Sequence, residues 1–266
     1  MATDTKLAPI SPTNIAKLED WELTLQSQAK AALAGEAAGM LRVTHQGGRL
    51  AIDGVPLDKS MNNTLVVGII DYIFIKGYRA EEGFDADNPT VPCCYAFGLN
   101  KTDKGMIPNK ASPDPQSEAC DTCPHNQFHT AGVGRGKRCR DGRRLAVIVE
   151  HSDPGSILKA EVRQLEVPPD SLKNAWGKYL ISLLEVTPTG SPVAVLTEIG
   201  TTTVPGKGGY RLTFRCVGKL DREAVKAIIA RQPKVLDMLT QPYPEMALPE
   251  KPAKPAAVAK ARKKLG

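Results

Sequence analysis

The 266-residue sequence lacks the long hydrophobic runs that cross membranes, and no stretch approaches the roughly 20 consecutive apolar residues that a bilayer requires. The first residues, MATDTKLAPISP, also lack the basic and then apolar plan of a secretory signal peptide. These two absences predict a soluble protein of a reducing, cytoplasmic compartment. In such a compartment cysteines remain free thiols or bind a metal, and disulfides are rare.

Signatures of common enzyme classes are lacking as well. No H-E-x-x-H, G-x-S-x-G or protein-kinase motif set occurs, and no two carboxylates have a spacing that nominates a general acid and a base. The glycine-rich stretch 132–137 departs from a phosphate-binding loop, because Arg138 stands where that motif needs Ser or Thr. We therefore predict a protein without catalytic activity. A nuclease assembled from distant carboxylates stays open as an alternative.

Net positive charge is scarce in the body of the chain. The formal net charge is +6, but residues 250–266 carry six basic side chains and one glutamate, which leaves about +1 for residues 1–249. This distribution excludes a uniformly basic coat for nucleic acid, so any binding charge must be local. From Pro242 the sequence is rich in Pro, Ala and Lys, which predicts a disordered basic tail over residues 242–266.

What the sequence does contain is a concentration of cysteine, since five of its six cysteines lie between Pro92 and Arg144. A C-x-x-C pair followed by proline supplies two thiolates at a suitable separation for one metal ion, and distant cysteines can complete a four-coordinate shell. Zinc suits four thiolates because it has no redox chemistry and accepts tetrahedral geometry. We predict one Zn²⁺ per chain, bound by Cys94, Cys120, Cys123 and Cys139.

Alternatives to this site remain open. The C-x-x-C pair could be a redox dithiol, although Pro- and Gly-rich loops flank it, and four cysteines could also hold an iron–sulfur cluster. Cys93 and Cys94 point to opposite sides of an extended segment, so only one of them can easily face the ion, and we favour Cys94. His125 or His129 could replace a cysteine, and Cys216 is interpreted as a small buried hydrophobe.

The patterning of the chain predicts more strands than helices. Residues 1–39 form an N-terminal segment with an amphipathic helix over 12–34, and the body spans 40–241. Strands are expected at 41–44, 49–52, 64–78, 143–149, 158–167, 192–203 and 210–217, and helices at 168–184 and 221–229 with a further turn at 233–239. Because strands and helices do not alternate regularly, we predict a mainly β (α+β) fold. Its core is an antiparallel barrel with helical decoration, and a cysteine-rich zinc subdomain occupies about 92–144.

Cations gather at the end of the cysteine-rich region, with six in ten residues opposed only by Asp141. Single-stranded nucleic acid is held by cations along its backbone and by aromatic faces on which the bases stack. The cluster therefore indicates nucleic-acid binding, and a solvated charged loop is the competing interpretation. The six cations are Arg135, Lys137, Arg138, Arg140, Arg143 and Arg144.

The strand that ends at Tyr78 carries aromatic residues at alternate positions, with Ile73 and Ile75 on its opposite face. We predict that the aromatic face is a stacking platform for bases, joined by two aromatics from a later segment. In the alternative interpretation the aromatic residues are buried and a helix covers the isoleucines. The predicted platform consists of Tyr72, Phe74, Lys76, Tyr78, Tyr95 and Phe97.

Several of these motifs resemble phage-type single-stranded-DNA-binding proteins. They are the C-x-x-C-P knuckle at Cys120, the G-x-G-K-x-C-R turn from Gly134 and the apolar strand that follows. The likeness covers residues 40–220 and includes Gly48-x4-Asp53-Gly54, 92–96, 120–126 and Val167-Pro168-Pro169-x-Ser171-Leu172-Lys173. In plan, though not in spacing, the chain also looks like the zinc-containing helix-destabilising proteins of large phages, which insert a zinc subdomain into an OB-type barrel.

The resemblance implies an OB-like fold and a non-catalytic protein that coats single-stranded DNA during phage replication or recombination in the host cytoplasm. It implies replication or recombination proteins as partners. Many such proteins recruit partners through an acidic tail, whereas residues 242–266 are basic, and this departure puts that route in doubt. The alternative function is a zinc-stabilised nuclease or recombination accessory enzyme, which would show metal-dependent cleavage.

Overall fold

The computed structural model describes residues 42–57, 62–80, 91–99, 104–132, 134–149, 153–204 and 209–243. The amphipathic helix predicted at 12–34 and the charged part of the predicted tail lie outside these ranges. Within them, nine strands form one sheet. The strands are β1 (Arg42–Gln46), β2 (Arg49–Ile52), β3 (Val55–Pro56), β4 (Leu65–Tyr78), β5 (Cys94–Gly98), β6 (Arg140–Val149), β7 (Arg163–Val167), β8 (Val195–Val204) and β9 (Gly209–Lys219).

The strands follow the order β3-β2-β1-β7-β6-β4-β8-β9, and β5 pairs with β4 off this path. Every pairing is antiparallel except β1 with β7, so the prediction of a mainly β fold with few helices is confirmed. The hairpins β1–β2 and β8–β9 consist of strands that the sequence predicts at 41–44 and 49–52 and at 192–203 and 210–217. The helices are α2 (Pro154–Lys159), α3 (Pro169–Ser171), α4 (Gly177–Val186) and α5 (Arg222–Leu239), and a π-helical turn (Leu172–Trp176) joins α3 to α4.

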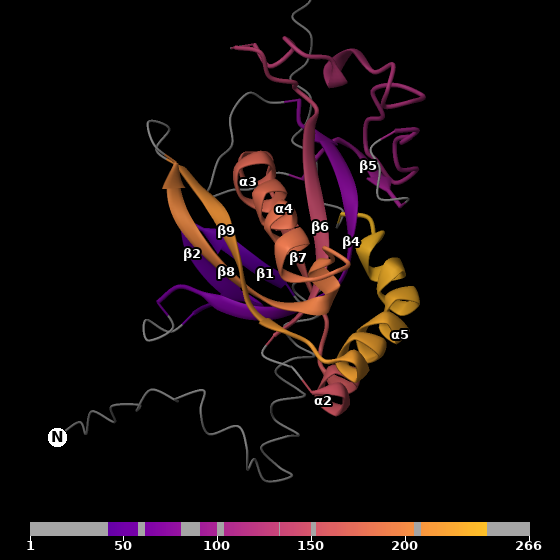
Figure 1. Cartoon of the computed structure of the whole chain (residues 1–266). Helices are drawn as coiled ribbons and strands as arrows, with labels where there is room; N and C mark the ends of the chain where they lie inside the picture. The colour runs from indigo at the N-terminus through magenta and orange to yellow at the C-terminus, as the bar shows by residue number, and fades with distance from the viewer. Residues whose placement is uncertain are drawn as a thin grey trace, which may run out of the picture.

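A β-bulge in β4 lets this long strand contribute to two hydrophobic cores. The register with β6 shifts between Ile69 and Asp71, and the extra residue exchanges the faces on which odd and even positions lie. Before the bulge Val67 and Ile69 pack in the core that also contains residues of α4. After the bulge Ile73 packs in the second core, against residues of α5. Figure 1 shows α4 and α5 lying against different parts of the sheet.

Two helices differ from the sequence prediction. The strand expected from residue 158 begins only at Arg163, because Asp153 caps α2 by accepting a hydrogen bond from the Ser156 amide. Helix α5 continues past its predicted end to Leu239, with Pro233 inside it. Proline removes one helical hydrogen bond, but Val235 and Leu239 are buried in the second core, and this packing holds the last turns in place.

The sheet curves but does not close into a barrel within the described residues, because β3 and β9 end an open path of strands. The closed OB-like barrel of the sequence prediction is therefore not found. The side chain of Asn63 links the β1–β2 hairpin to β8, which do not pair with each other in the sheet. It accepts a hydrogen bond from the Leu50 amide and donates to the Gly48 carbonyl and the Thr201 hydroxyl, each at 2.7 Å. No described helix is long and apolar enough to span a membrane.

Candidate nucleic-acid interface and cysteine centre

The register of the sheet brings two of the predicted metal ligands to one end of β4. Cys94 lies opposite Tyr78 in the β4–β5 pair. On the other side of β4, Arg140 pairs with Gly77, so Cys139 lies one residue beyond the same end. Tyr78, Cys94 and Cys139 pack together with Cys93 in a small buried cluster. The thiol of Cys93 donates to the carbonyl of Tyr78 at 3.4 Å and is thus engaged with the β4 backbone.

The C-x-x-C pair sits in a tight turn at this same end, on the long connection between β5 and β6 (Figure 1). The Cys123 amide donates to the Cys120 carbonyl, and the side chain of Asn126 donates to that carbonyl at 2.7 Å. The Cys139 amide donates to the carbonyl of His125 at 2.8 Å, which ties the turn to the start of β6. The ring of His125 stacks on Tyr78 with centroids 4.2 Å apart. We call residues 120–139 the knuckle.

The four thiols are buried and lie within electrostatic range of one another. Burial raises the pKa of the Cys139 thiol to about 12, and the neighbouring thiols add to this rise. Burial likewise raises the pKa of Cys120 to about 11. Among the neighbouring charged groups, Cys94 has the largest effect, and it also raises this pKa. Lys76 acts in the opposite direction on both thiols, because its ammonium group favours a nearby thiolate.

The donor chemistry of this centre fits zinc, since all four cysteines are free thiols and three separate chain segments supply them. As the side chains are placed, no group of three or more His, Cys, Asp or Glu residues in the described ranges is arranged to hold an ion. Zinc is therefore a proposal. Of the alternative ligands, His125 is stacked on Tyr78, and His129 is exposed with a positive φ of 70°. Cys216 is half-buried in β9.

The predicted cations divide into exposed and buried members. Arg135 and Arg140 are exposed, whereas Lys137, Arg138 and Arg143 are half-buried. These five residues lie in the second half of the knuckle and at the start of β6. An exposed guanidinium is free to meet a phosphate, so Arg135 and Arg140 are the members best placed for that role.

Arg144 has a structural role and does not belong to the exposed cluster, contrary to the sequence prediction. Its side chain is 1% exposed. It donates to Glu166 at 2.9 and 3.1 Å and to the carbonyls of Leu239 and Gln241 at 3.0 and 2.9 Å. The guanidinium also lies 4.7 Å from the ring centroid of Tyr243. Arg144 thereby fixes the end of α5 to β6 and is not available to a phosphate.

Lys76 is also buried, with 3% of its side chain exposed. Its ammonium group lies 2.7 Å from Asp141, and Lys137 contacts the other oxygen of the same carboxylate at 2.7 Å. Burial alone would raise the pKa of Asp141, but hydrogen bonds from the two lysines outweigh it and the pKa is lowered. Lys76, which the sequence predicts to be part of the nucleic-acid platform, is thus held in a buried ion pair beside the cysteine centre.

The aromatic face of β4 is covered, so it does not form the predicted open platform. Tyr78 is buried, as is Tyr95 from β5 at 2% exposure. Tyr72 packs edge-on against Trp176, and Arg143 lies 3.4 Å over the ring of Phe74. The residues of the opposite face, Ile73 and Ile75, belong to the core that α5 covers, and the half-buried Phe97 packs against that core. The buried Tyr78 and the covered isoleucines agree with the alternative interpretation, whereas Tyr72 and Phe74 are only half-buried.

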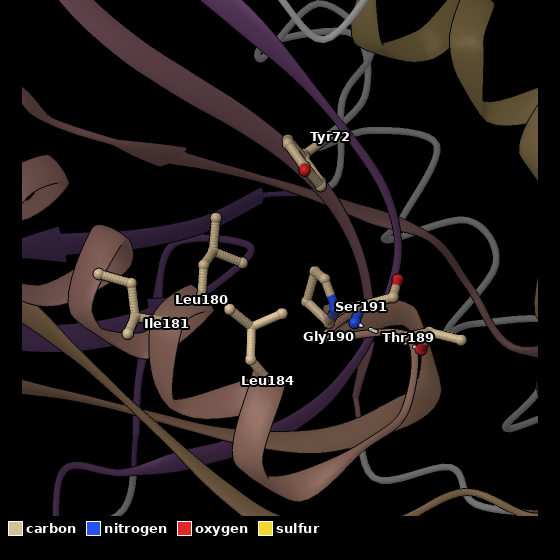
Figure 2. Close-up of a pocket in the computed structure, with 8 residues that line it drawn as sticks. Tyr72, Leu180, Ile181, Leu184, Thr189, Gly190 and Ser191 are labelled. Atoms are coloured by element: carbon tan, nitrogen blue, oxygen red, sulfur yellow. Dashed lines mark hydrogen bonds between the residues drawn. The ribbon is translucent and has the colours of Figure 1, made fainter.

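A shallow apolar depression lies elsewhere, beside α4. Figure 2 shows Leu180, Ile181 and Leu184 of that helix on one side of it and Tyr72 of β4 on the other. Its remaining lining comes from residues 189–192. Among the described residues that line this depression, none is charged and none is a histidine or a cysteine.

Sequence reasoning missed the residues that brace the knuckle. Gln127 donates to the carbonyls of Asp121 and Cys123, and Thr130 donates to the carbonyls of His125 and Gln127. Hydroxyl and amide side chains directly after a C-x-x-C-P motif were the available signal, because such side chains commonly bond to nearby backbone groups.

Comparison with known protein families, with curated proteins and with solved structures finds no match for this chain.

Proposed function

We propose that this protein binds single-stranded DNA without catalysis, through exposed arginines on a cysteine knuckle that one zinc ion stabilises. The observation that carries the proposal is the position of Arg135 and Arg140 at the surface of a segment whose backbone is fixed to the cysteine centre. Cations held on a fixed scaffold bind a phosphate backbone with less loss of conformational entropy than cations on a mobile loop.

The charge distribution within the cysteine-rich region supports a polyanionic ligand. The carboxylates Asp114, Glu118 and Asp121 precede or begin the knuckle, whereas the cations cluster in its second half and at the start of β6. Lys76 and Lys137 share Asp141, so the carboxylate that interrupts the basic run is already neutralised. The remaining field near Arg135 and Arg140 is positive, which favours phosphates.

Zinc would be held by Cys94, Cys120, Cys123 and Cys139, and it would supply a tetrahedral cross-link between β5, the C-x-x-C turn and the start of β6. The buried ammonium group of Lys76 would offset part of the negative charge of four thiolates. In the proposed reading the curved sheet is an OB-like scaffold whose open side is bridged by Asn63, and replication or recombination proteins are its partners.

The proposal is tested by titrating the full-length, zinc-loaded protein with labelled oligo-dT at several salt concentrations. Each phosphate contact contributes about 0.7 to the slope of log K against log salt for a single strand. We expect Arg135→Ala and Arg140→Ala each to weaken binding and to reduce the slope by about that amount. Arg222→Ala is the matched control, because Arg222 is an exposed cation at the start of α5, beside α2 and away from the knuckle (Figure 1).

Two results would contradict the proposal. One is wild-type protein that fails to bind oligo-dT at low salt. The other is binding that the Arg222→Ala control weakens as much as Arg135→Ala does, since the knuckle would then have no special role. Metal-dependent cleavage of the oligonucleotide would instead favour the nuclease.

A further inference from the structure

Phe128, which lies within the knuckle, has the most exposed large hydrophobic side chain in the described part of the chain, at 71%. The exposed hydrophobics elsewhere are mainly aliphatic, and single exposed side chains of that kind are ordinary features of protein surfaces. Phe128 differs because it is aromatic and lies on the same segment as the exposed arginines. It therefore combines a free π-face with local positive charge.

The backbone around Phe128 is held from both sides. The Thr130 amide donates to the Gly136 carbonyl at 3.1 Å, and the Arg138 amide donates to the Thr130 hydroxyl at 3.0 Å. The Thr130 hydroxyl also donates to the Gln127 carbonyl at 2.7 Å. Phe128 is thus presented by a braced loop, and ordering it on binding costs little additional entropy.

A fixed cation lies on one side of the ring. The ammonium group of Lys137 is 5.6 Å from the ring centroid of Phe128, and Asp141 and Asn126 hold that group in place. Arg135 lies across the loop, because the His129 amide donates to its carbonyl. A ligand that stacks on the other face of Phe128 thus meets a ring that already carries a cation, which disfavours an apolar or basic protein surface and favours an anionic ligand with a flat face.

We infer that Phe128 stacks on an unpaired nucleobase while the neighbouring cations contact the adjoining phosphates. The inference rests on the proposed function and deepens it, since it assigns base contact to a residue outside the aromatic face of β4. An unpaired base exposes a π-face that any exposed aromatic side chain can meet, and this contact is independent of the base sequence.

The test compares two ligands of equal length, oligo-dT and an abasic strand with the same phosphates and no bases, using full-length, zinc-loaded protein. Stacking of one base on an aromatic side chain corresponds to roughly a 5- to 150-fold change in affinity. We expect Phe128→Ala to weaken binding to oligo-dT by this factor and to leave binding to the abasic strand unchanged. Phe128→Tyr keeps a π-face and should bind oligo-dT like the wild type.

Two further variants complete the design. Phe128→Leu keeps an apolar side chain without a π-face and should lose affinity for oligo-dT, while Ile181→Ala, an exposed hydrophobic of α4, should lose none. If the wild type binds oligo-dT and Phe128→Ala binds it with the same affinity, the inference is overturned and the proposed function stays intact. Equal losses on both strands would also overturn it, because the ring would then act without a base. Failure of the wild type to bind either strand would overturn the function itself.

Discussion

At the scale of single residues, Arg140 and Arg144 show that one side-chain type serves two purposes on one strand. Both lie in β6, four residues apart. The first is exposed at the edge of the knuckle, and the second is buried among four hydrogen bonds to Glu166 and the end of α5. A run of basic residues in a sequence does not show which arginine is exposed and which is buried, because burial depends on which helix packs over the strand.

We predict that Arg144→Ala lowers the free energy of unfolding by roughly 1–3 kcal/mol, because it leaves the carbonyl of Leu239 without its buried donor. The affinity of the folded variant for oligo-dT should stay unchanged. Arg140→Ala should show the reverse pattern, with unfolding within about 0.5 kcal/mol of wild type and weaker binding. Urea denaturation and oligo-dT titration measure the two effects, and weaker binding by folded Arg144→Ala would contradict the assignment.

Tyr179 provides a prediction about alkaline stability. Burial raises its pKa to about 12, although a hydrogen bond with Thr197 acts in the opposite direction. The folded state therefore favours the neutral phenol, and this stabilisation is complete below the ordinary pKa near 10 and is lost as pH rises from there towards 12. Tyr179→Phe should lose less stability than wild type between pH 10 and 12 in urea denaturation. Parallel curves for the two proteins would contradict this.

At the scale of elements, the knuckle and the end of β4 form one unit, because Tyr78 contacts both the cysteine cluster and His125. We predict that Cys120→Ser loses stoichiometric zinc and melts at a lower temperature, since structural zinc contributes directly to folding. Elemental analysis and thermal denaturation measure these effects. Cys216→Ser is the control, because Cys216 lies in β9. Retention of one zinc per chain by Cys120→Ser would refute the ligand assignment.

Much of the sheet follows from local patterns, and the parts that do not follow have physical causes. The hairpins β1–β2 and β8–β9 were predictable from alternation and turn residues. The bulge at Ile69–Asp71 was not, because an inserted residue leaves a continuous apolar run unchanged in the sequence while it exchanges the faces of the strand. Because the sequence does not reveal the bulge, it could not predict that Tyr78 and Lys76 are buried. The spacing of the cysteines nominated the candidate centre, but the bracing by Gln127 and Thr130 depends on the folded loop.

At the scale of the whole molecule, Asn63 joins strands that the sheet leaves apart. We predict that Asn63→Gly lowers the free energy of unfolding by roughly 1–3 kcal/mol, because it removes three hydrogen bonds and leaves the Leu50 amide without an acceptor. Glycine tolerates the positive φ of 56° at this position, so backbone strain does not contribute. Asn62→Gly is the matched control, since Asn62 is exposed at a φ of 47°. Equal stability losses in urea denaturation would refute the bridging role.

Residues 244–266 of the basic tail lie beyond the described residues and supply most of the net charge of the chain. We predict that deletion of residues 244–266 weakens oligo-dT binding at low salt and makes the salt dependence shallower, because a polycation releases counterions from DNA. Binding should persist at a reduced level, since Arg135 and Arg140 remain. If the truncated protein showed the same slope of log K against log salt, the tail would serve a purpose other than binding DNA.

The pairing of β1 with β7 and of β4 with β8 also has a consequence for folding kinetics. Residues 42–43 meet residues 164–165, and residues 65–68 meet residues 196–199, so both pairings close loops of more than a hundred residues. Sheets dominated by such distant pairings fold on the millisecond-to-second scale. During synthesis the edge of β4 that β8 later covers stays unpaired until almost the whole chain has left the ribosome, and in that interval the nascent chain is most exposed to aggregation.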